Sequence, residues 1–164
     1  MFDLRQVVRD NLEVARRVLL VFELKRRLDE IPPVLPRVSK IREFASARVE
    51  EIKDASLPLV LVFVASCLEH YLREAAPADE RKAKFWKLID HFSSRIGDKL
   101  ALSAHEMRIK RNIILHNAGV IDNKALKDFE KKGLMGYSVG AKLTLSEDEV
   151  RGYIDVCEKI CNLT

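Results

Sequence analysis

Apolar side chains recur every three or four residues along most of this chain, and this spacing constrains the fold more than any other feature. An α-helix has 3.6 residues per turn, so such a pattern gives each helix one apolar face that must be buried against other helices. We therefore expect an all-α bundle. The first helix should cover about residues 3–28, with the apolar positions Leu4, Val8, Leu12, Ala15, Leu19 and Phe22.

Proline and glycine divide this pattern into separate helices. The three prolines at positions 32, 33 and 36 must end the first helix, because proline lacks an amide hydrogen and clashes with the preceding turn. The helical pattern resumes at about residue 41, and Pro58 indicates a fresh helix start or a kink. A further helix is expected over about residues 80–96, ending at Gly97.

The central segment, residues 57–74, is apolar nearly all round in its first half, as a buried helix would be. Its β-branched residues Val60, Val62 and Val64 leave a buried strand open as an alternative. The longest apolar run in this segment has 12 residues, whereas a spanning helix needs ~20. We expect no membrane span, and the first ten residues show no secretory signal.

Two S-x-x-E sequences match the capping box, in which a serine and a glutamate satisfy the free amides of a helix start. Ser103 and Glu106 predict a helix over about residues 104–117. Ser146 and Glu149 predict the start of a last helix that runs through about residue 161.

The segment before the last helix has a different character. Five of the six glycines follow residue 117, which indicates a flexible segment over about residues 118–140. Polar and apolar residues alternate over 141–145, which favours a short strand. We expect a single domain, residues 1–164, of about five to six helices with a short irregular or β insertion before the last one.

The composition is that of one soluble domain in a reducing compartment. The 164 residues are 48% apolar and 33% charged, which excludes collagen, low-complexity disorder and a disulfide-stapled miniprotein. Three cysteines form no C-x-x-C pair, and Cys157 and Cys161 without nearby histidines make a poor zinc site. We expect a cytoplasmic protein with free thiols. The net charge of +4 permits a polyanionic partner without requiring one.

The stretch from Arg108 to Gly119 is the one candidate for chemistry, since the Walker, G-x-G-x-x-G, H-E-x-x-H and G-x-S-x-G signatures are absent. Arg108, Asn112 and His116 are spaced by four residues and share one helix face. Arg111 lies five residues before His116, about 140° round the helix. Either the long guanidinium reaches the same ligand, or two copies of the helix pool both residues across a dimer.

The string R-N-x-x-x-H-N-A-G-V-I-D, residues 111–122, closely resembles the R-x4–6-H signature of the HEPN superfamily, in particular its RiboL-PSP-HEPN branch. In that signature a polar residue follows the arginine, as Asn112 follows Arg111 here. The resemblance implies a helical bundle that usually dimerises and brings two motifs together in a cleft. Many members are metal-independent endoribonucleases, including toxins of toxin–antitoxin pairs and antiviral effectors.

The residue types suit metal-free RNA cleavage, in which the 2′-hydroxyl attacks the adjacent phosphate. Histidine titrates near neutrality, so His116 is expected to act as general acid and base. Arg111 is expected to hold the phosphate charge, and Asn112 to orient a phosphate oxygen or the histidine. Further RNA contacts are expected from Arg108, Lys110 and Asn117. The prediction requires no metal and no cofactor.

Two other interpretations of the motif remain open. A non-catalytic HEPN-like module would bind a nucleotide or a partner protein, such as an antitoxin or a small nucleotidyltransferase. A plain helical scaffold would use His116 only to complement the helix dipole. Sequence-specific RNA reading is unsupported, because no aromatic residues cluster near the motif. Tyr137 and Tyr153 are the nearest candidates for stacking on a base.

Other charged clusters have default structural interpretations. Glu69, His70 and Arg73 are expected to form an ion-pair cluster, and a second polar site is the alternative. The basic stretches at residues 25–27 and 81–84 are expected to be solvated faces, with contact to an RNA backbone as the less favoured use. His91 and His105 are expected on the helix surface.

Overall fold

The computed structural model describes the backbone of residues 4–30 and 36–164, and the side chains of residues 4–20, 22–23 and 52–164. The described backbone contains six α-helices and no named strand, so the all-α prediction is confirmed. The helices are α1 (Leu4–Glu30), α2 (Pro36–Ala75), α3 (Phe85–Ile96), α4 (Asp98–Asn117), α5 (Asn123–Lys131) and α6 (Glu147–Leu163).

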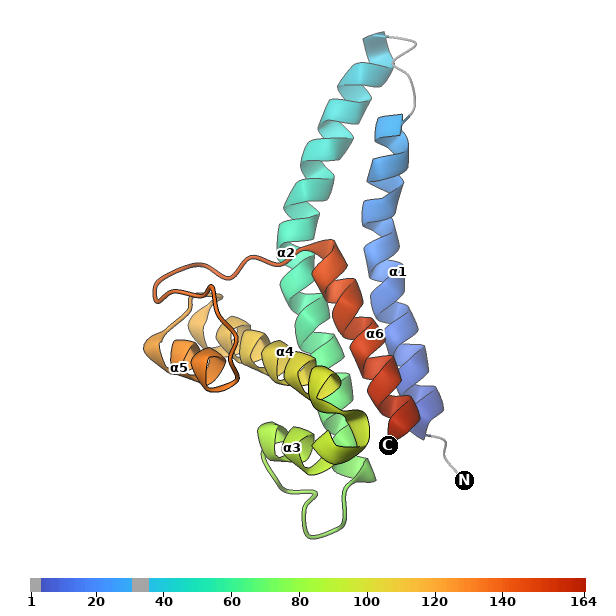
Figure 1. Ribbon diagram of the computed structural model, residues 1–164. Coiled ribbons are helices and arrows are strands. Elements are labelled where there is room, and N and C mark those ends of the chain that lie inside the picture. The colour runs from blue at the N-terminus through green and yellow to red at the C-terminus, as the bar shows by residue number, and fades with distance from the viewer. Residues whose placement is uncertain (1–3, 31–35) are drawn as a thin grey trace.

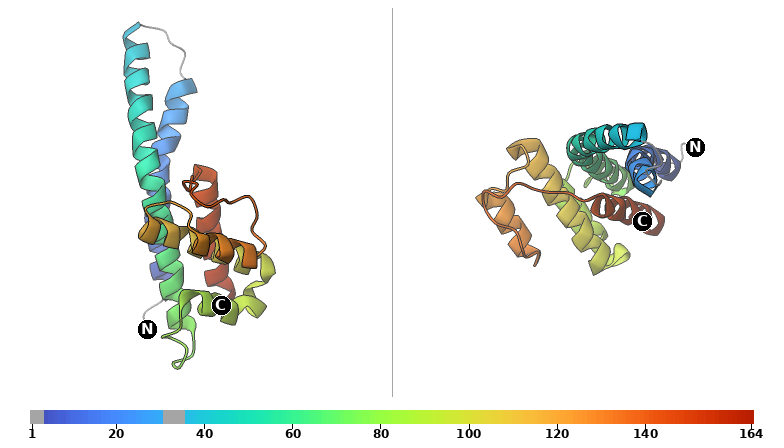
Figure 2. Two further views of the ribbon diagram at one scale, coloured as in Figure 1. Left: turned by 90° about the vertical axis from the view of Figure 1, so that its left-hand side faces the viewer. Right: turned by 90° about the horizontal axis from the view of Figure 1, so that it is seen from above.

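Helices α1 and α2 form a long antiparallel hairpin, and α6 packs along both of them (Figure 1). Helix α4 crosses α2 and α6, and α3 packs beneath it against the end of α2. Helix α5 contacts only α4 among the helices and forms the outermost layer, which the view from above in Figure 2 shows clearly. The start of α1 and the end of α6 lie at the same end of the bundle (Figure 1).

The core has a large and a small part. The large part joins the apolar face predicted for α1 to α2, α3, α4 and α6, and Leu12, Leu19, Leu61, Leu68 and Leu72 are wholly buried in it. The small part fixes α5 on α4 through Ile109, Ile113, Ile121, Ala125 and Phe129. Burying a large apolar side chain contributes roughly 1.5–3 kcal/mol, so five residues suffice to hold a nine-residue helix in place.

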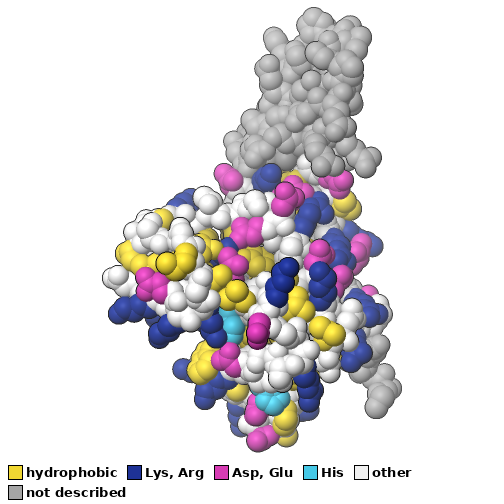
Figure 3. Space-filling view, in the orientation of Figure 1, with side chains coloured by type: hydrophobic (Ala, Val, Ile, Leu, Met, Phe, Trp, Pro, Cys, Tyr) yellow, Lys and Arg dark blue, Asp and Glu magenta, His cyan; other side chains and the backbone are white. Residues whose placement is uncertain are grey.

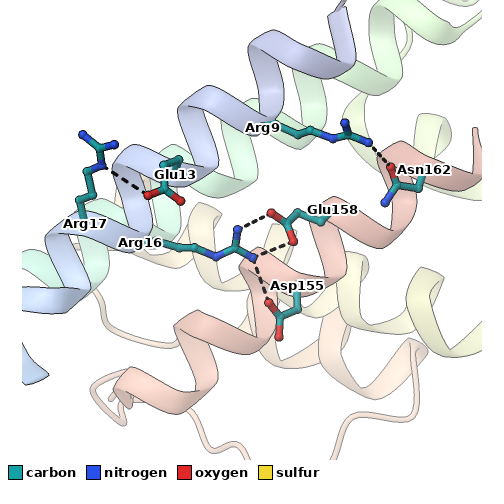
Figure 4. A network of polar contacts seen from close by, with 7 residues as sticks. All are labelled: Arg9, Glu13, Arg16, Arg17, Asp155, Glu158 and Asn162. Carbon is teal, nitrogen blue, oxygen red and sulfur yellow. Dashed lines mark hydrogen bonds and ion pairs between the residues drawn. The ribbon is translucent and has the colours of Figure 1, made fainter.

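Polar contacts close the outer seam between α1 and α6 (Figure 4). Arg16 binds Glu158 through two nitrogens and lies 3.3 Å from Asp155. Arg9 donates to Asn162 over 2.9 Å. The hydrogen bond to Glu158 raises the pKa of Arg16, and burial opposes this effect. These contacts fix the register of α6 on α1, although exposed ion pairs contribute at most about 1 kcal/mol each.

Several helix boundaries differ from the predicted ones. Helix α2 runs without interruption through Pro58, so a fresh helix start there and a buried strand at Val60–Val64 are both wrong. The helix expected from residue 80 begins at Phe85, because residues 77–83 form turns. The end of the first helix lies at Glu30, and the prolines at 32 and 33 lie outside the described residues.

The two predicted capping boxes have opposite outcomes. Ser146 and Glu149 form a complete capping box at the start of α6, as predicted. Ser103 caps nothing, because α4 begins earlier, at Asp98, and the Ser103 hydroxyl donates to the Lys99 carbonyl within the helix over 3.1 Å. An S-x-x-E sequence in the middle of a helix has no free amides to satisfy.

The segment 118–140 is more ordered than its glycines indicate. It contains α5, whose N-cap is Asp122: the carboxylate accepts from the Ala125 amide over 2.7 Å. The strand predicted over residues 141–145 is reduced to one isolated bridge between Val120 and Lys142. The insertion before the last helix is therefore a short helix followed by irregular chain.

Within the described residues, the 24-residue stretch Ile52–Ala75 is long and apolar enough to cross a membrane, judged by length and composition alone. Half of that stretch is buried in the bundle. All three cysteines are free and buried. Burial raises the pKa of the Cys157 thiol well above its usual value.

Candidate nucleic-acid interface

The motif predicted from the sequence occupies the last two turns of α4. The helix ends at Asn117, and the next residue, Ala118, has a φ of 49°, the left-handed conformation that usually ends a helix with glycine. The Ala118 amide donates to the Ile113 carbonyl. Since Ile109 and Ile113 are buried against α5, the side chains between them are directed to the flanks of the α4–α5 pair.

A groove of about 880 Å³ lies on one flank, between the end of α2, the start of α3, α4 and α5. We call it the basic groove. Its lining contains eight cations against three acids, an excess of five positive charges, whereas the whole chain carries +4. Figure 3 shows basic side chains, in dark blue, below the region of α5. The cations are Arg73, Lys82, Lys84, Arg108, Arg111, Lys124, Lys131 and Lys132, and the acids are Glu69, Asp90 and Asp128.

Arg111 lies in the wall of this groove, in an ion pair with Glu69 of α2 (N–O distance 3.1 Å). The other Glu69 oxygen accepts from Arg73 over 2.9 Å, so one carboxylate serves two guanidinium groups. The ion-pair interpretation of Glu69 and Arg73 is therefore confirmed, whereas His70 is exposed. The Nε of Arg111 is buried and has no hydrogen-bond partner among the described residues.

Arg108 lies deeper in the same groove and is only 8% exposed. The nearest carboxylate among the described residues, on Asp128, is 3.9 Å from the Arg108 guanidinium. The Nε of Arg108 also has no hydrogen-bond partner among them. Burial lowers the pKa of Arg108, and Asp128 opposes that effect. A buried guanidinium with so weak a partner is costly, since removing a charge from water is repaid only by close pairing. A phosphate in the groove would supply that pairing.

His116 opens into a second, smaller hollow of about 200 Å³ between α4 and α5, which we call the histidine pocket. Asn112 and Lys124 line both this pocket and the basic groove, so the two hollows adjoin. The structure thus brings Asn112 next to Arg111 on one side and next to His116 on the other. Within one chain it does not place Arg111 and His116 in the same hollow.

Asn117 also lines the histidine pocket, close to the Asp122 carboxylate. The Ala125 amide and Asn117 both lower the pKa of Asp122, in that order. Since Asp122 is the N-cap of α5, Asn117 has a structural partner as well as access to the pocket.

Lys110 has a different environment from the one expected of an RNA contact. It is 3% exposed and ion-paired with Glu106 (2.8 Å) and Glu149. The rings of Tyr137 and Tyr153 lie 5.5 and 5.6 Å from its ammonium. Burial alone lowers the pKa of Lys110, but the surrounding oxygens of Tyr153, Glu106 and Glu149 reverse this, and the pKa is raised. Lys110 joins α4 to α6, and its charge is paired within the protein, so we no longer expect it to contact RNA.

Sequence reasoning missed several groove residues. Lys82 and Lys84 belong to a basic stretch that was expected to be a solvated face, with RNA contact as the less favoured use. Both lysines are exposed and line the groove. Lys131 and Lys132 lie at the end of α5, a helix that was not predicted.

His105 was expected on the surface but is 3% exposed. Its Nε2 lies 2.8 Å from Asp90 and 2.9 Å from the Lys132 ammonium at the groove edge. Burial first and Lys132 second lower the pKa of His105. Burial and Lys132 therefore favour the neutral form of His105, and the nearby Asp90 opposes them.

Comparison with protein-family models, with curated proteins and with solved structures found no match. Among the residues that the structure describes, no group of three or more histidine, cysteine, aspartate or glutamate side chains could hold a metal ion.

Proposed function

We propose that this chain is a metal-independent HEPN-type endoribonuclease. The observation that carries the proposal is the position of the R-N-x-x-x-H motif: Arg111 and Asn112 line a groove with five excess positive charges, and Asn112 connects this groove to the pocket of His116. A polyanion is the ligand that such a charge excess attracts most strongly. The motif therefore coincides with the part of the described surface where a phosphate backbone is best accommodated.

The reaction needs proton transfer and charge stabilisation. His116 accepts the proton of the 2′-hydroxyl while the 2′-oxygen forms a bond to phosphorus. The bond from phosphorus to the 5′-oxygen breaks, that oxygen takes up a proton, and the products carry a 2′,3′-cyclic phosphate and a 5′-hydroxyl. Arg111 neutralises the charge that develops on the phosphate oxygens. Asn112, which lines both hollows, orients a phosphate oxygen or the imidazole.

We further propose that the active unit is a homodimer. Arg111 and His116 line different hollows of one chain, so a second copy is the simplest way to bring one of each to the same phosphate. Leu115, next to His116, is 49% exposed and is apolar surface that a second copy would cover. In the cytoplasm, an antitoxin or a nucleotidyltransferase is the expected partner of such a nuclease.

The test is incubation of the purified wild type, His116→Ala and Arg111→Ala with total RNA in EDTA, followed by analysis of the product ends. The proposal predicts cleavage to 2′,3′-cyclic phosphate ends by the wild type, and a loss of about 10²–10⁴-fold in each variant. Folding of the variants is checked by circular dichroism. Equal cleavage by wild type and variants would contradict the assignment of these residues.

A second candidate is a non-catalytic module that binds a nucleotide or a partner protein. The Arg111–Glu69 ion pair favours it, because a guanidinium already paired with a carboxylate is partly neutralised before any substrate arrives. This candidate predicts no cleavage of any RNA by the folded dimer, together with measurable binding of a nucleotide or a protein partner.

A further inference from the structure

Trp86, the only tryptophan of the chain, lies in the second position of α3 and lines the basic groove. Its neighbours Phe85, Leu88 and Ile89 are buried, whereas Trp86 is 40% exposed. It also lines an adjoining hollow with Lys82, Lys84 and Lys87. The indole is therefore accessible at the place where two lysine-rich hollows meet.

The other aromatic residues near the motif are already occupied. Tyr137 is stacked on Phe129, with 3.8 Å between the ring centres and an angle of 7° between the planes, and its hydroxyl donates to Glu106 over 2.7 Å. Tyr153 is 5% exposed. One face of the Tyr137 ring is therefore covered by Phe129 and Tyr153 is buried, whereas Trp86 is 40% exposed.

We propose that Trp86 stacks on a nucleobase of single-stranded RNA whose phosphates lie along the basic groove. The inference rests on the proposed function and adds the substrate class. Sequence-tolerant binding of single strands combines a cationic track for the backbone with an aromatic platform for the bases, and Trp86 among the groove lysines has this arrangement.

The exposed indole favours a single strand over a duplex, and the lysine beside it does not block a base. The bases of a duplex are stacked on one another and present no face to an exposed indole, whereas unpaired bases do. The ammonium of Lys87 lies 5.6 Å from the ring centre. At an exposed site this cation–π contact is weak, so the flexible lysine can yield the face to a base and contact the neighbouring phosphate instead.

The test uses tryptophan fluorescence, which reports on Trp86 alone because the chain has no other tryptophan. Wild-type protein is titrated with a short 2′-O-methyl RNA, which has no 2′-hydroxyl nucleophile and cannot be cleaved. An abasic oligonucleotide of equal length provides the same phosphates without bases. We expect quenching by the RNA and none by the abasic chain at equal occupancy, with occupancy measured by fluorescence anisotropy of a label.

In the same anisotropy assay, Trp86→Ala should weaken binding of the 2′-O-methyl RNA by about 5- to 150-fold, the range for loss of one stacked base. Trp86→Phe should retain most of the affinity, and Leu102→Ala, which removes an exposed apolar side chain elsewhere on α4, should have no effect. Equal quenching by the abasic chain, or unchanged affinity in Trp86→Ala, would overturn the stacking proposal.

This result is separable from the nuclease proposal, because the probe is not cleaved. Base-dependent quenching without cleavage of ordinary RNA would leave the stacking proposal standing and refute the nuclease. Cleavage of ordinary RNA without base-dependent quenching would support the nuclease and refute the stacking proposal. Equal affinity for a matched RNA duplex would also refute the choice of a single strand.

Discussion

The two sides of α4 use the same kind of side chain in opposite ways. On the α6 side, Lys110 is enclosed by two carboxylates and two tyrosine rings, and its charge is satisfied within the protein. On the groove side, Arg108 and Arg111 share few acidic partners, and the Nε of each is buried without one. Cations that are neighbours in the sequence thus differ in role. Lys110 is paired within the protein, whereas Arg108 and Arg111 have fewer carboxylates near them and are left to bind a ligand.

Replacing Lys110 should lower the free energy of unfolding far more than replacing its neighbour Arg111. Lys110→Met leaves Glu106 and Glu149 without their shared cation and should lower the free energy of unfolding by about 3 kcal/mol. Arg111→Met is the matched control, and it should cost less than about 1 kcal/mol because Glu69 keeps its ion pair with Arg73. Urea denaturation followed by circular dichroism measures both. Equal losses in the two variants would remove the distinction between the two sides.

The dimer contact should be nearly as sensitive. Leu115→Lys places a charge in the apolar contact proposed next to His116, and about 2 kcal/mol of desolvation weakens the dimer roughly thirtyfold. A cation near the C-terminal end of a helix is favourable, so the fold should survive. Leu102→Lys on the same helix should leave the dimer intact. Light scattering over a dilution series checks both, and a Leu115→Lys dimer of unchanged affinity would exclude this surface.

His105, at the groove edge, should make the free energy of unfolding depend on pH. Its folded-state pKa lies below that of an unfolded histidine, about 6.5, so the unfolded chain binds the proton more tightly. The stabilisation is present above that pH and is lost as the pH falls below it, at up to about 1.4 kcal/mol per pH unit.

His105→Gln should reduce that slope between about pH 6.5 and 5. His91→Gln is the control, since His91 lies near the surface beside Glu80. Urea midpoints measured across this range test the prediction, and an unchanged slope in His105→Gln would contradict it.

The smallest effect should come from a single groove lysine. Lys131→Ala removes one phosphate contact, so it should weaken binding of single-stranded RNA a few-fold and reduce the salt dependence, the slope of log K against log salt, by about 0.7. Lys127→Ala is the matched control, because Lys127 lies on the same helix but does not line the groove. Equal effects of the two would show that binding follows net charge and not the groove.

The sequence predicted the parts of the fold that local patterns determine. The apolar face of α1 and the capping box of α6 were correct, because a 3.6-residue period and an S-x-x-E start are both local signals. The same S-x-x-E signal failed at Ser103, where the helix had already begun at Asp98. Helix α5 was missed because its nine residues stand among glycines.

The site could be predicted only in part, for a related reason. The order of Arg111, Asn112 and His116 along α4 is local, and so is their distribution over its two flanks. The burial of Lys110 depends on Glu149, which is 39 residues away in the sequence. The exposure of Trp86 at the groove depends on how α3 packs beneath α4. Such tertiary contacts cannot be predicted from the spacing of residues along the chain.

The most direct test of the account is complementation between two inactive variants. If each active site combines Arg111 of one chain with His116 of the other, mixing Arg111→Ala with His116→Ala restores one intact site in every mixed dimer. Random exchange makes half of the dimers mixed, so an equal mixture should recover roughly a quarter of the wild-type RNA cleavage rate in EDTA. A mixture as inactive as the separate variants, with exchange confirmed by differently tagged chains, would contradict the shared site.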